Sequence, residues 1–461
     1  MTNVQAKNID ELKNRFKGKI VLPSDSAYDS TRKIWNAMID KHPAVIARCA
    51  STSDVVLGVN FARENDLLLA VRGGGHNIAG SALCDDGIVI DLSQMKTTSV
   101  EPTKRRATVE GGATLADFDA ATLAYGLATP LGINSTTGVA GLTLGGGFGW
   151  LSRKYGMTVD SLVSAEVVNA AGEVIHASAT EHPDLFWALR GGGGNFGVVT
   201  HFEFQLHPVA PGMLSGLIVY PISQAKQVLQ QYRDFIAKAP DELSVWTVLR
   251  KAPPLPFLPP EAHGQEVIVL AMLYAGDPKQ GEPLIEPLRR FGTPLGEHIG
   301  VQPYTAWQQA FDPLLTPGAR NYWKSHNFST LADGLFDAVI EYIGKLPSSQ
   351  CEIFFGAIGG ATERQAPNAT AYAHRDARFV MNVHGRWDDA ADDKRCIDWA
   401  RAFFQASAPF ASGGVYVNFL TADEGDRVRS AYGPNYDRLA RIKMQYDPDN
   451  LFRTNQNIAP A

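Results

Sequence analysis

Four clusters of glycine lie between residues 72 and 197, and they limit the folds open to this chain more than any other feature of its sequence. They occupy residues 72–77 (RGGGHN), 110–113 (EGGA), 138–149 (GVAGLTLGGGFG) and 190–197 (RGGGGNFG). Glycine is used where a backbone approaches a ligand closely or adopts a positive φ. Loops of this kind present N–H groups to an anion such as pyrophosphate. We therefore expect backbone loops that hold a ligand, with strands beside them.

Three better-known sites that use similar motifs are disfavoured. Gly192, Gly194 and Gly197 match G-x-G-x-x-G, but a dinucleotide site needs a strand before this motif and a helix after it. Here the helix-like segment 182–190 comes first and the strand-like segment 198–206 follows. The sequence contains neither G-x-x-x-x-G-K-[ST], which argues against a P-loop, nor G-x-S-x-G, which argues against a nucleophilic triad.

His76 directly follows three glycines, in the position of a loop that faces a ligand. No nearby histidine or cysteine has the spacing of a metal site, so no metal is expected. Covalent attachment of a cofactor to His76 therefore stays open, beside a purely structural role.

Charge and composition indicate a globular protein without nucleic-acid or membrane partners. The chain has 42 Lys and Arg against 48 Asp and Glu, for a formal charge of −6, and contains no long run of Lys and Arg. Its longest clear apolar stretch, 267–275, is far shorter than the roughly 20 residues of a membrane span. The N-terminus is polar, without the apolar segment of a signal peptide. The four scattered cysteines predict buried thiols in a reducing compartment, so we expect a cytoplasmic protein.

The spacing of apolar residues changes near residue 211. Before it, short strands alternate with helices, among them two that we expect to begin with capping boxes, Ser51 with Asp54 and Thr114 with Asp117, and 165–178 predicts a hairpin. After it, longer strands come in pairs between longer helices, which favours an antiparallel sheet with helices on one face. The proline-rich segment 252–260 predicts a stiff surface loop, and a short strand is expected near Tyr416.

Four segments together resemble the berberine bridge enzyme-like branch of the vanillyl-alcohol oxidase/p-cresol methylhydroxylase (PCMH) flavoprotein superfamily. They are VRGGGHNIAG, TTGVAGLTLGGGFGWLSRKYG, DLFWALRGGGGNFGVVT and YDPDNLFRTNQNI, and their order is that of the family. The resemblance implies an α+β fold: a two-part FAD-binding domain of the PCMH type with an inserted substrate domain, built on an antiparallel sheet covered by helices. The implied boundaries are 1–210 for the first part (its PCMH-type region being about 38–210), 211–410 for the substrate domain and 411–461 for the C-terminal return.

The resemblance also implies site residues. His76 matches the histidine that bonds the 8-methyl carbon of FAD, and Tyr416 matches the tyrosine that often faces the substrate as a base. The residues implied to surround FAD are Arg72, Gly73, Gly74, Gly75, Asn77, Gly80, Ser81, Asn134, Thr137, Gly138, Gly141, Gly145, Gly147, Gly149, Gly197, Val199, Asn418, Asn455 and Gln456.

Two positions separate this chain from other members of the family. Many members attach FAD a second time through a cysteine, but here that position is Asn134, and no cysteine occurs between Cys84 and Cys351. We therefore expect a single covalent link, through His76, and a smaller or more enclosed substrate than an oligosaccharide. Thr137 stands where relatives that use oxygen carry a small residue, which favours an oxidase.

The expected reaction is removal of a hydride from an alcohol or amine carbon of a small organic molecule to flavin N5, with reoxidation by O2 to H2O2. Because a free tyrosine has a pKa of about 10, Tyr416 needs a cation or hydrogen bonds to act as the base. Trp150 and Tyr322, and after them Glu352 or Phe354, are the candidates for substrate contact. A dehydrogenase with another acceptor, a natural-product cyclase or oxygenase, and a flavoprotein that only binds a small molecule stay open, as do a monomer and a homodimer.

Overall fold

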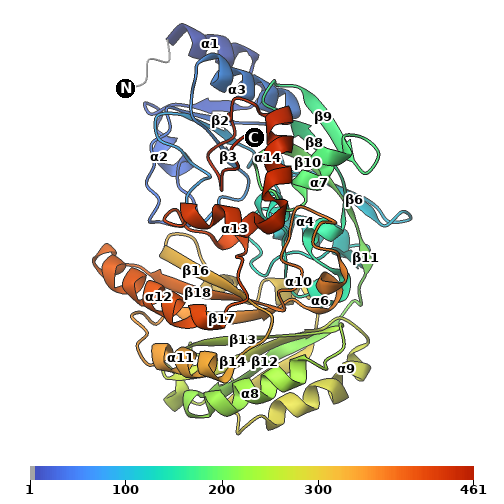
Figure 1. The fold of residues 1–461 in the computed structure, drawn as a ribbon, viewed down its shortest axis with the longest axis vertical. Helices are drawn as coiled ribbons and strands as arrows, with labels where there is room; N and C mark the ends of the chain where they lie inside the picture. Colours follow the sequence, from blue (N-terminus) through green and yellow to red (C-terminus); the bar gives the residue numbers. More distant parts are fainter. Residues whose placement is uncertain (1–5) are drawn as a thin grey trace.

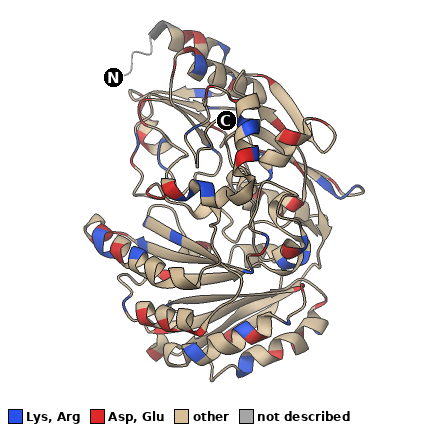
Figure 2. Cartoon of the chain, in the orientation of Figure 1, with Lys and Arg blue, Asp and Glu red and all other residues tan. Residues whose placement is uncertain are grey.

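The computed structural model describes residues 6–461, and within that range the chain forms two α/β halves, each built on its own sheets (Figure 1). Strands of the first half end at Pro208, and those of the second begin at Met213. The predicted α+β fold class is confirmed. Among the described helices, none combines the length and the apolar character that a membrane crossing requires. Positively and negatively charged residues are mixed over the ribbon rather than gathered by sign (Figure 2).

The first sheet is four-stranded, in the order β1-β2-β4-β3. Its strands are β1 (Lys19–Val21), β2 (Val45–Arg48), β3 (Leu69–Arg72) and β4 (Ile88–Asp91). β2, β4 and β3 are parallel and almost wholly buried, which fits their continuous apolar sequences. β3 ends at Arg72, where the first glycine cluster begins, so this cluster lies at the carboxyl edge of the parallel strands.

The second sheet is five-stranded and antiparallel, in the order β5-β6-β10-β8-β9. Its strands are β5 (Thr98–Glu101), β6 (Arg106–Glu110), β8 (Leu162–Val168), β9 (Val174–Ser178) and β10 (Val198–Gln205). The predicted hairpin is formed by β8 and β9. The remaining glycine clusters follow β6, enclose the short helix α5 (Val139–Leu144), and connect α7 (Pro183–Leu189) to β10. A two-stranded sheet pairs β7 (Leu127–Ala128) with β11 (His207–Pro208).

Only one of the two predicted capping boxes forms. Helix α4 (Leu115–Leu123) begins with the box of Thr114 and Asp117, as expected. Helix α3 (Thr52–Glu64) has Ser51 at its N-cap without a capping hydrogen bond, so that prediction was wrong. Asp54 instead accepts hydrogen bonds from the backbone N–H groups of Lys17, Gly18 and Ala50. These donors, two of which come from the segment around Lys17 and Gly18, orient the carboxylate away from the capping position.

The third large sheet is seven-stranded and antiparallel, in the order β15-β12-β14-β13-β17-β18-β16. Its strands are β12 (Met213–Pro221), β13 (Leu243–Lys251), β14 (Glu266–Tyr274), β15 (Gly296–Gln302), β16 (Arg320–Phe328), β17 (Glu352–Ala357) and β18 (Phe379–Trp387). Helices α8 (Ala225–Ile236), α9 (Pro278–Ile285), α11 (Asp333–Ile343) and α12 (Asp393–Ser407) cover one face, and the other face is turned toward the first half (Figure 1). The predicted antiparallel sheet with helices on one face is confirmed.

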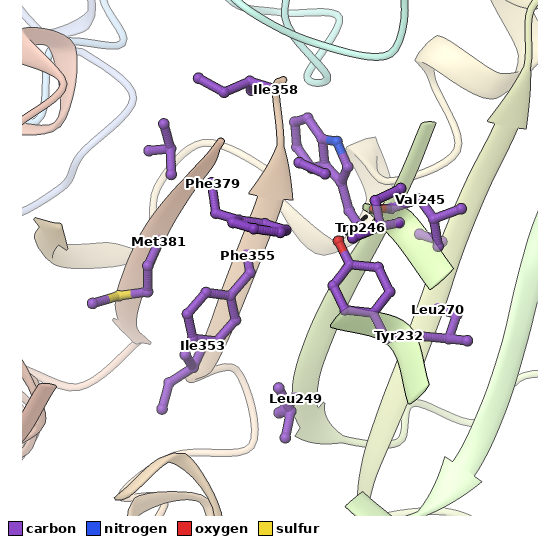
Figure 3. Packing of buried hydrophobic residues seen from close by; sticks show 14 of the residues in the cluster. Tyr232, Val245, Trp246, Leu249, Leu270, Ile353, Phe355, Ile358, Phe379 and Met381 are labelled. Carbon is purple, nitrogen blue, oxygen red and sulfur yellow. Dashed lines mark hydrogen bonds between the residues drawn. The ribbon is translucent and has the colours of Figure 1, made fainter. Parts of the chain in front are cut away.

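Alternation along the strands decides which residues reach each face. Val245, Leu249 and Phe355 pack against Tyr232 of α8 in the main apolar core (Figure 3). The residues between them, such as Val248 and Phe354, point to the opposite face because successive side chains of a strand alternate.

The C-terminal segment returns to the first half, as Figure 1 shows for α13 (Val428–Tyr432) and α14 (Tyr436–Tyr446). Leu439 and Ile442 of α14 share an apolar core with Leu185 and Phe186 of α7. The strand expected near Tyr416 is absent from this described segment, where a single 3₁₀ turn, Val417–Phe419, takes its place.

The two halves also meet at a buried carboxyl group, Asp119 of α4. Gln308 of α10 (Tyr304–Gln308) donates from Nε2 to Asp119 Oδ2 at 3.0 Å and to the carbonyl of Gly132 at 3.0 Å. Burial raises the pKa of Asp119 from 3.8 to about 7. Because the folded pKa is the higher one, the protonated form stabilises the fold, fully below about pH 4 and progressively less as the pH rises to about 7.

We expect Asp119→Asn to remove this pH dependence. Between pH 5 and pH 8 the wild-type protein should lose roughly 3 kcal/mol of unfolding free energy through Asp119, since one pKa unit corresponds to about 1.4 kcal/mol. The variant should keep that free energy, which urea unfolding at the two pH values measures. Glu64→Gln, at an exposed position, is the control and should follow the wild type. Parallel pH profiles for wild type and Asp119→Asn would contradict the prediction.

Candidate active site

A cavity of about 380 Å³ lies where the glycine loops meet the uncovered face of the seven-stranded sheet. Many residues predicted from the sequence line it, although they come from distant parts of the chain. They are Gly73, Gly74, Gly75, His76, Asn77, Ser81, Asn134, Thr137, Gly138, Gly141, Trp150, Gly197, Val199, Glu352, Phe354, Tyr416, Asn418, Asn455 and Gln456. The fold therefore brings three of the four glycine clusters and the C-terminal tail to one site, and no residue of the fourth cluster, 110–113, lines the cavity.

Two of the glycine loops touch back to back. A β-carbon on Gly74 would lie 2.3 Å from the backbone nitrogen of Gly138, and one on Gly138 would lie 2.4 Å from the nitrogen of Gly74. Glycine is therefore needed here for the loops to approach. At Gly141 and Gly194 a β-carbon would meet nothing within 4 Å, because both positions face open space in the cavity.

His76 is held in one tautomer by its neighbours. The Thr136 hydroxyl donates to Asn134 Oδ1 at 2.8 Å, so its oxygen accepts from His76 Nε2 at 2.9 Å. The backbone N–H of Thr136 also donates to Asn134 Oδ1, which identifies that atom as the oxygen. Nε2 then carries the proton and Nδ1 carries the lone pair. Burial lowers the pKa of His76 to about 4, so the ring is neutral at pH 7, and it stacks on Trp35 at 5.0 Å.

The cavity wall fits the cofactor that the resemblance implies. Thr454 Oγ1 and Asn455 Oδ1 are buried on this wall and have no hydrogen-bond partner within the described chain. The open backbone at Gly141 and Gly194 leaves room for a flat or extended group. FAD, with a tricyclic ring and a pyrophosphate, matches a cavity bounded by glycine loops and by unpartnered hydroxyl and amide oxygens.

The other residues predicted to surround FAD lie outside the cavity lining. Arg72 bonds Asp91 through two nitrogens and the carbonyl of Thr31 through a third. Gly145 and Gly149 have no room for a β-carbon, which would lie 2.2 Å from Asn418 and 2.0 Å from the Leu131 carbonyl. Arg72, Gly145 and Gly149 therefore contact other parts of the protein and stabilise the loops, rather than facing the cavity. The two further residues of this group are Gly80 and Gly147.

Tyr416 is buried in the cavity wall, and its hydroxyl oxygen accepts two hydrogen bonds. The donors are the backbone N–H of Gly147 at 3.1 Å and Asn418 Nδ2 at 2.9 Å. Burial nevertheless raises the pKa of Tyr416 to about 12, and the two hydrogen bonds only partly oppose it. No cation among the described residues contributes. Tyr416 is therefore a neutral phenol at pH 7, and its own proton is free to be donated.

Three ionisable side chains form a row across the sheet face. Arg250 of β13 lies opposite Glu352 of β17, which lies opposite His384 of β18, and all three line the cavity. Arg250 Nη1 donates to Glu352 Oε2 at 2.7 Å. Burial would raise the pKa of Glu352, but its neighbours, above all the positive charge of Arg250, more than offset this and hold the pKa below its ordinary value. The lining contains no other carboxylate among the described residues.

His384 is oriented by Asn321. Asn321 Oδ1 accepts from Arg386 Nη1 at 3.2 Å and lies 2.9 Å from His384 Nε2, so Nε2 carries the ring proton. Burial lowers the pKa of His384, which keeps the ring neutral. His384 Nδ1 then faces Glu352 Oε1 at 3.6 Å, and both atoms are proton acceptors. Nδ1 and Oε1 can therefore bind one additional proton between them.

Tyr322 is not among the described residues that line the cavity, whereas the next residue, Trp323, is. Alternation along β16 turns Tyr322 to the helix-covered face, where its hydroxyl donates to Asp423 at 2.6 Å and accepts from Arg401 of α12. Trp150 does line the cavity, and its ring packs on Trp246 at 4.8 Å.

Several lining residues were missed by the sequence reasoning. Arg250, Asn382 and His384 lie in strands that give no motif, and Trp35 lies in an irregular segment. The loop at 252–260 was expected only as a surface loop, but Leu255 and Leu258 line the cavity. The large apolar side chains among the prolines of this loop, Leu255, Phe257 and Leu258, were the one available signal, and they do not specify what the loop covers.

Comparisons with known proteins agree with this geometry. A family model described as an FAD binding domain matches residues 43–178, and one described as berberine and berberine like matches residues 415–459. The (R)-6-hydroxynicotine oxidase of Paenarthrobacter nicotinovorans is 31% identical over 461 residues, with 96% of this chain and 97% of that protein covered. An FAD-linked oxidoreductase of Bacillus subtilis is 30% identical, with 97% and 98% covered.

Solved structures show the same fold. The crystal structure of 6-hydroxy-D-nicotine oxidase from Arthrobacter nicotinovorans has a TM-score of 0.87 at 30% identity and covers 97% of this chain and 98% of that one. The xylooligosaccharide oxidase from Myceliophthora thermophila, solved with xylobiose, has a TM-score of 0.84 at 27% identity and covers 98% and 99%. The fold of the two halves therefore has close structural counterparts.

Proposed function

Because the chain belongs to the berberine bridge enzyme-like family of FAD-linked oxidoreductases, we propose that it is a cytoplasmic oxidase of a small organic or natural-product molecule. The bond that it oxidises is a C–H of an alcohol or amine carbon. The observation that carries the proposal is the shared cavity, in which the glycine loops and His76 face the Glu352–His384 pair and Tyr416. One wall suits a redox cofactor, and the other offers groups that can move a proton.

His76 and the loops around Gly74, Gly138 and Gly194 are the residues that hold the cofactor. When bound, FAD supplies a two-electron acceptor that takes a hydride from the substrate carbon and passes the electrons to oxygen, giving H2O2. The neutral His76 ring, with its lone pair on Nδ1, is suited to the single covalent link predicted from the sequence. Asn134, through the Thr136 hydroxyl, keeps the ring proton on Nε2 and so leaves Nδ1 unprotonated.

The residues on the sheet face handle the proton of the substrate's O–H or N–H group. Glu352 is ionised at neutral pH and shares with His384 Nδ1 a gap without a proton. We assign the proton released with the hydride to this pair. Tyr416, as a neutral phenol, hydrogen-bonds the reacting oxygen or nitrogen. It is a catalytic residue in this proposal, but a donor rather than the base expected from the sequence.

The electron acceptor is tested by reoxidation. The holoenzyme is screened anaerobically for bleaching of the flavin by alcohols and amines, and the reduced enzyme is then mixed with air-saturated buffer. An oxidase should recover its absorbance within seconds and release one H2O2 for each flavin. Recovery that needs a quinone would instead identify a dehydrogenase. A product without net O2 consumption would identify a cyclase, and an unchanged flavin across the panel would favour a binding protein.

A further inference from the structure

Asn382 of β18 presents an amide to the substrate side of the cavity with neither polar atom satisfied. It is only 1% exposed, and its Oδ1 and Nδ2 have no hydrogen-bond partner in the described chain. It lines the cavity and lies directly opposite Phe354 of β17. Its neighbours Met381 and Val383 pack in the core on the other face of the sheet, so alternation directs Asn382 toward the cavity.

Away from Asn382 and the ionisable residues, the sheet face that lines the cavity is mostly apolar. Six aliphatic lining residues come from β12, β13 and β14 of this face, namely Leu217, Val219, Val248, Val267, Val269 and Ala271. Few charged residues appear on the strands of the seven-stranded sheet in Figure 2, and the two charged residues that line the cavity, Arg250 of β13 and Glu352 of β17, form an ion pair. A sugar would leave most of its hydroxyl groups without partners against such walls.

A buried primary amide is satisfied by one specific arrangement of ligand atoms. Its oxygen accepts one hydrogen bond and its NH2 group donates, so both are satisfied together by a neighbouring N–H and C=O on one ligand. A ligand that lacks either atom leaves the other half of Asn382 buried and unpaired, which is unfavourable.

Building on the oxidase assignment, we propose that the substrate is a compact, mainly apolar molecule that carries an amide-type edge, such as a carboxamide or a lactam. Asn382 is the residue that recognises this edge. The Glu352–His384 pair lies one step along the same strands, because Phe354 and Glu352, like Asn382 and His384, are two residues apart. One bound molecule can therefore contact Asn382 and place its O–H or N–H group at the proton-accepting pair.

The test measures binding without turnover. Benzamide and acetophenone have nearly the same shape, but acetophenone has a methyl group in place of the NH2 group. Each is titrated into the holoenzyme, and its Kd is read from the change in the flavin absorbance spectrum. We expect benzamide to bind roughly 10- to 100-fold more tightly than acetophenone, the effect of one or two hydrogen bonds in a buried site. Cellobiose should leave the spectrum unchanged.

Two variants test whether Asn382 causes the preference for benzamide over acetophenone. Asn382→Leu should abolish the advantage of benzamide while leaving the affinity for acetophenone within about threefold, since a leucine of similar size keeps the apolar contact. Asn327→Leu is the matched control, because Asn327 is also a buried asparagine with both amide atoms unpartnered but does not line the cavity. It should retain the full preference.

Equal affinity for the two probes in the wild type, failure of benzamide to bind, binding of cellobiose, or an undiminished preference in Asn382→Leu would each overturn the inference. Because no turnover is needed, its failure is separate from that of the oxidase assignment. A protein that prefers benzamide through Asn382 but is reduced by no alcohol or amine would overturn only the latter.

Discussion

The His76→Ala variant is expected to release its flavin entirely when the protein is denatured in acid, whereas the wild-type protein should precipitate yellow. The reason is that the proposed covalent bond has a single donor atom, Nδ1 of a neutral ring. No second link can compensate, since the residue at the alternative position is Asn134 and no cysteine lines the cavity among the described residues. The absorbance of supernatant and pellet at the flavin maximum gives the covalent fraction.

Thr136→Val refines this prediction. Valine keeps the shape of threonine but cannot accept from Nε2, so the ring proton is free to move to Nδ1 and block the bond. We expect the covalent fraction of flavin to rise more slowly than in the wild type when the apoprotein is incubated with FAD, but to reach the same final value. Thr143→Val, which removes a buried hydroxyl from α5, is the control for lost packing. Yellow supernatant from the wild type would contradict the link itself.

The second large effect is expected for Glu352→Gln, which should slow anaerobic flavin reduction by about 10²- to 10⁴-fold, the range of general base catalysis. Glutamine keeps the shape but cannot take the proton with His384. In the wild type, the pKa values of Glu352 and His384 both lie below their ordinary values. Both groups are therefore proton-free at pH 7, and the reduction rate should stay level around neutral pH and fall only in acid.

Loss of the Glu352 charge leaves Arg250 buried without a partner, and breaking such a pair costs about 3–5 kcal/mol. The double variant Arg250→Met/Glu352→Gln removes both charges and should regain stability in urea unfolding while staying slow. If it regains the rate as well, Glu352 has only a structural role. Tyr416→Phe tests the other candidate base: a rate that is lost in Tyr416→Phe but unchanged in Glu352→Gln would restore Tyr416 as the base.

The local order of the first half could be predicted because glycine and the capping residues act over short distances. The hairpin of β8 and β9 and the capping box of Thr114 formed as expected. Asp54 shows the limit of such reasoning. Its carboxylate fits a capping box in sequence, but donors from Lys17 and Gly18 bind it instead, and they come from a segment that only folding brings near.

The residues on the substrate side of the cavity could not be predicted in the same way, because strand register decides which of them face the cavity and short motifs do not encode register. From the sequence, Tyr322 and Trp323 are equally plausible as residues that face the cavity. Because side chains alternate along β16, only one of them can do so: Trp323 faces the cavity, and Tyr322 faces the ionic groups on the other side of the sheet. Arg250 lies 102 residues before Glu352 in the chain, and His384 comes later still. The three become neighbours only because β13, β17 and β18 pair in one register.

Sequence alone determined where the glycine loops lie and led to the prediction that they and one histidine surround a cofactor, because a missing side chain is a local property of the backbone. Tertiary structure alone decided the tautomer of His76, the neutral state of Tyr416 and the pairing of Glu352 with His384. Those properties depend on burial and on hydrogen bonds between residues far apart in the chain, and both exist only once the two halves have packed around their shared cavity.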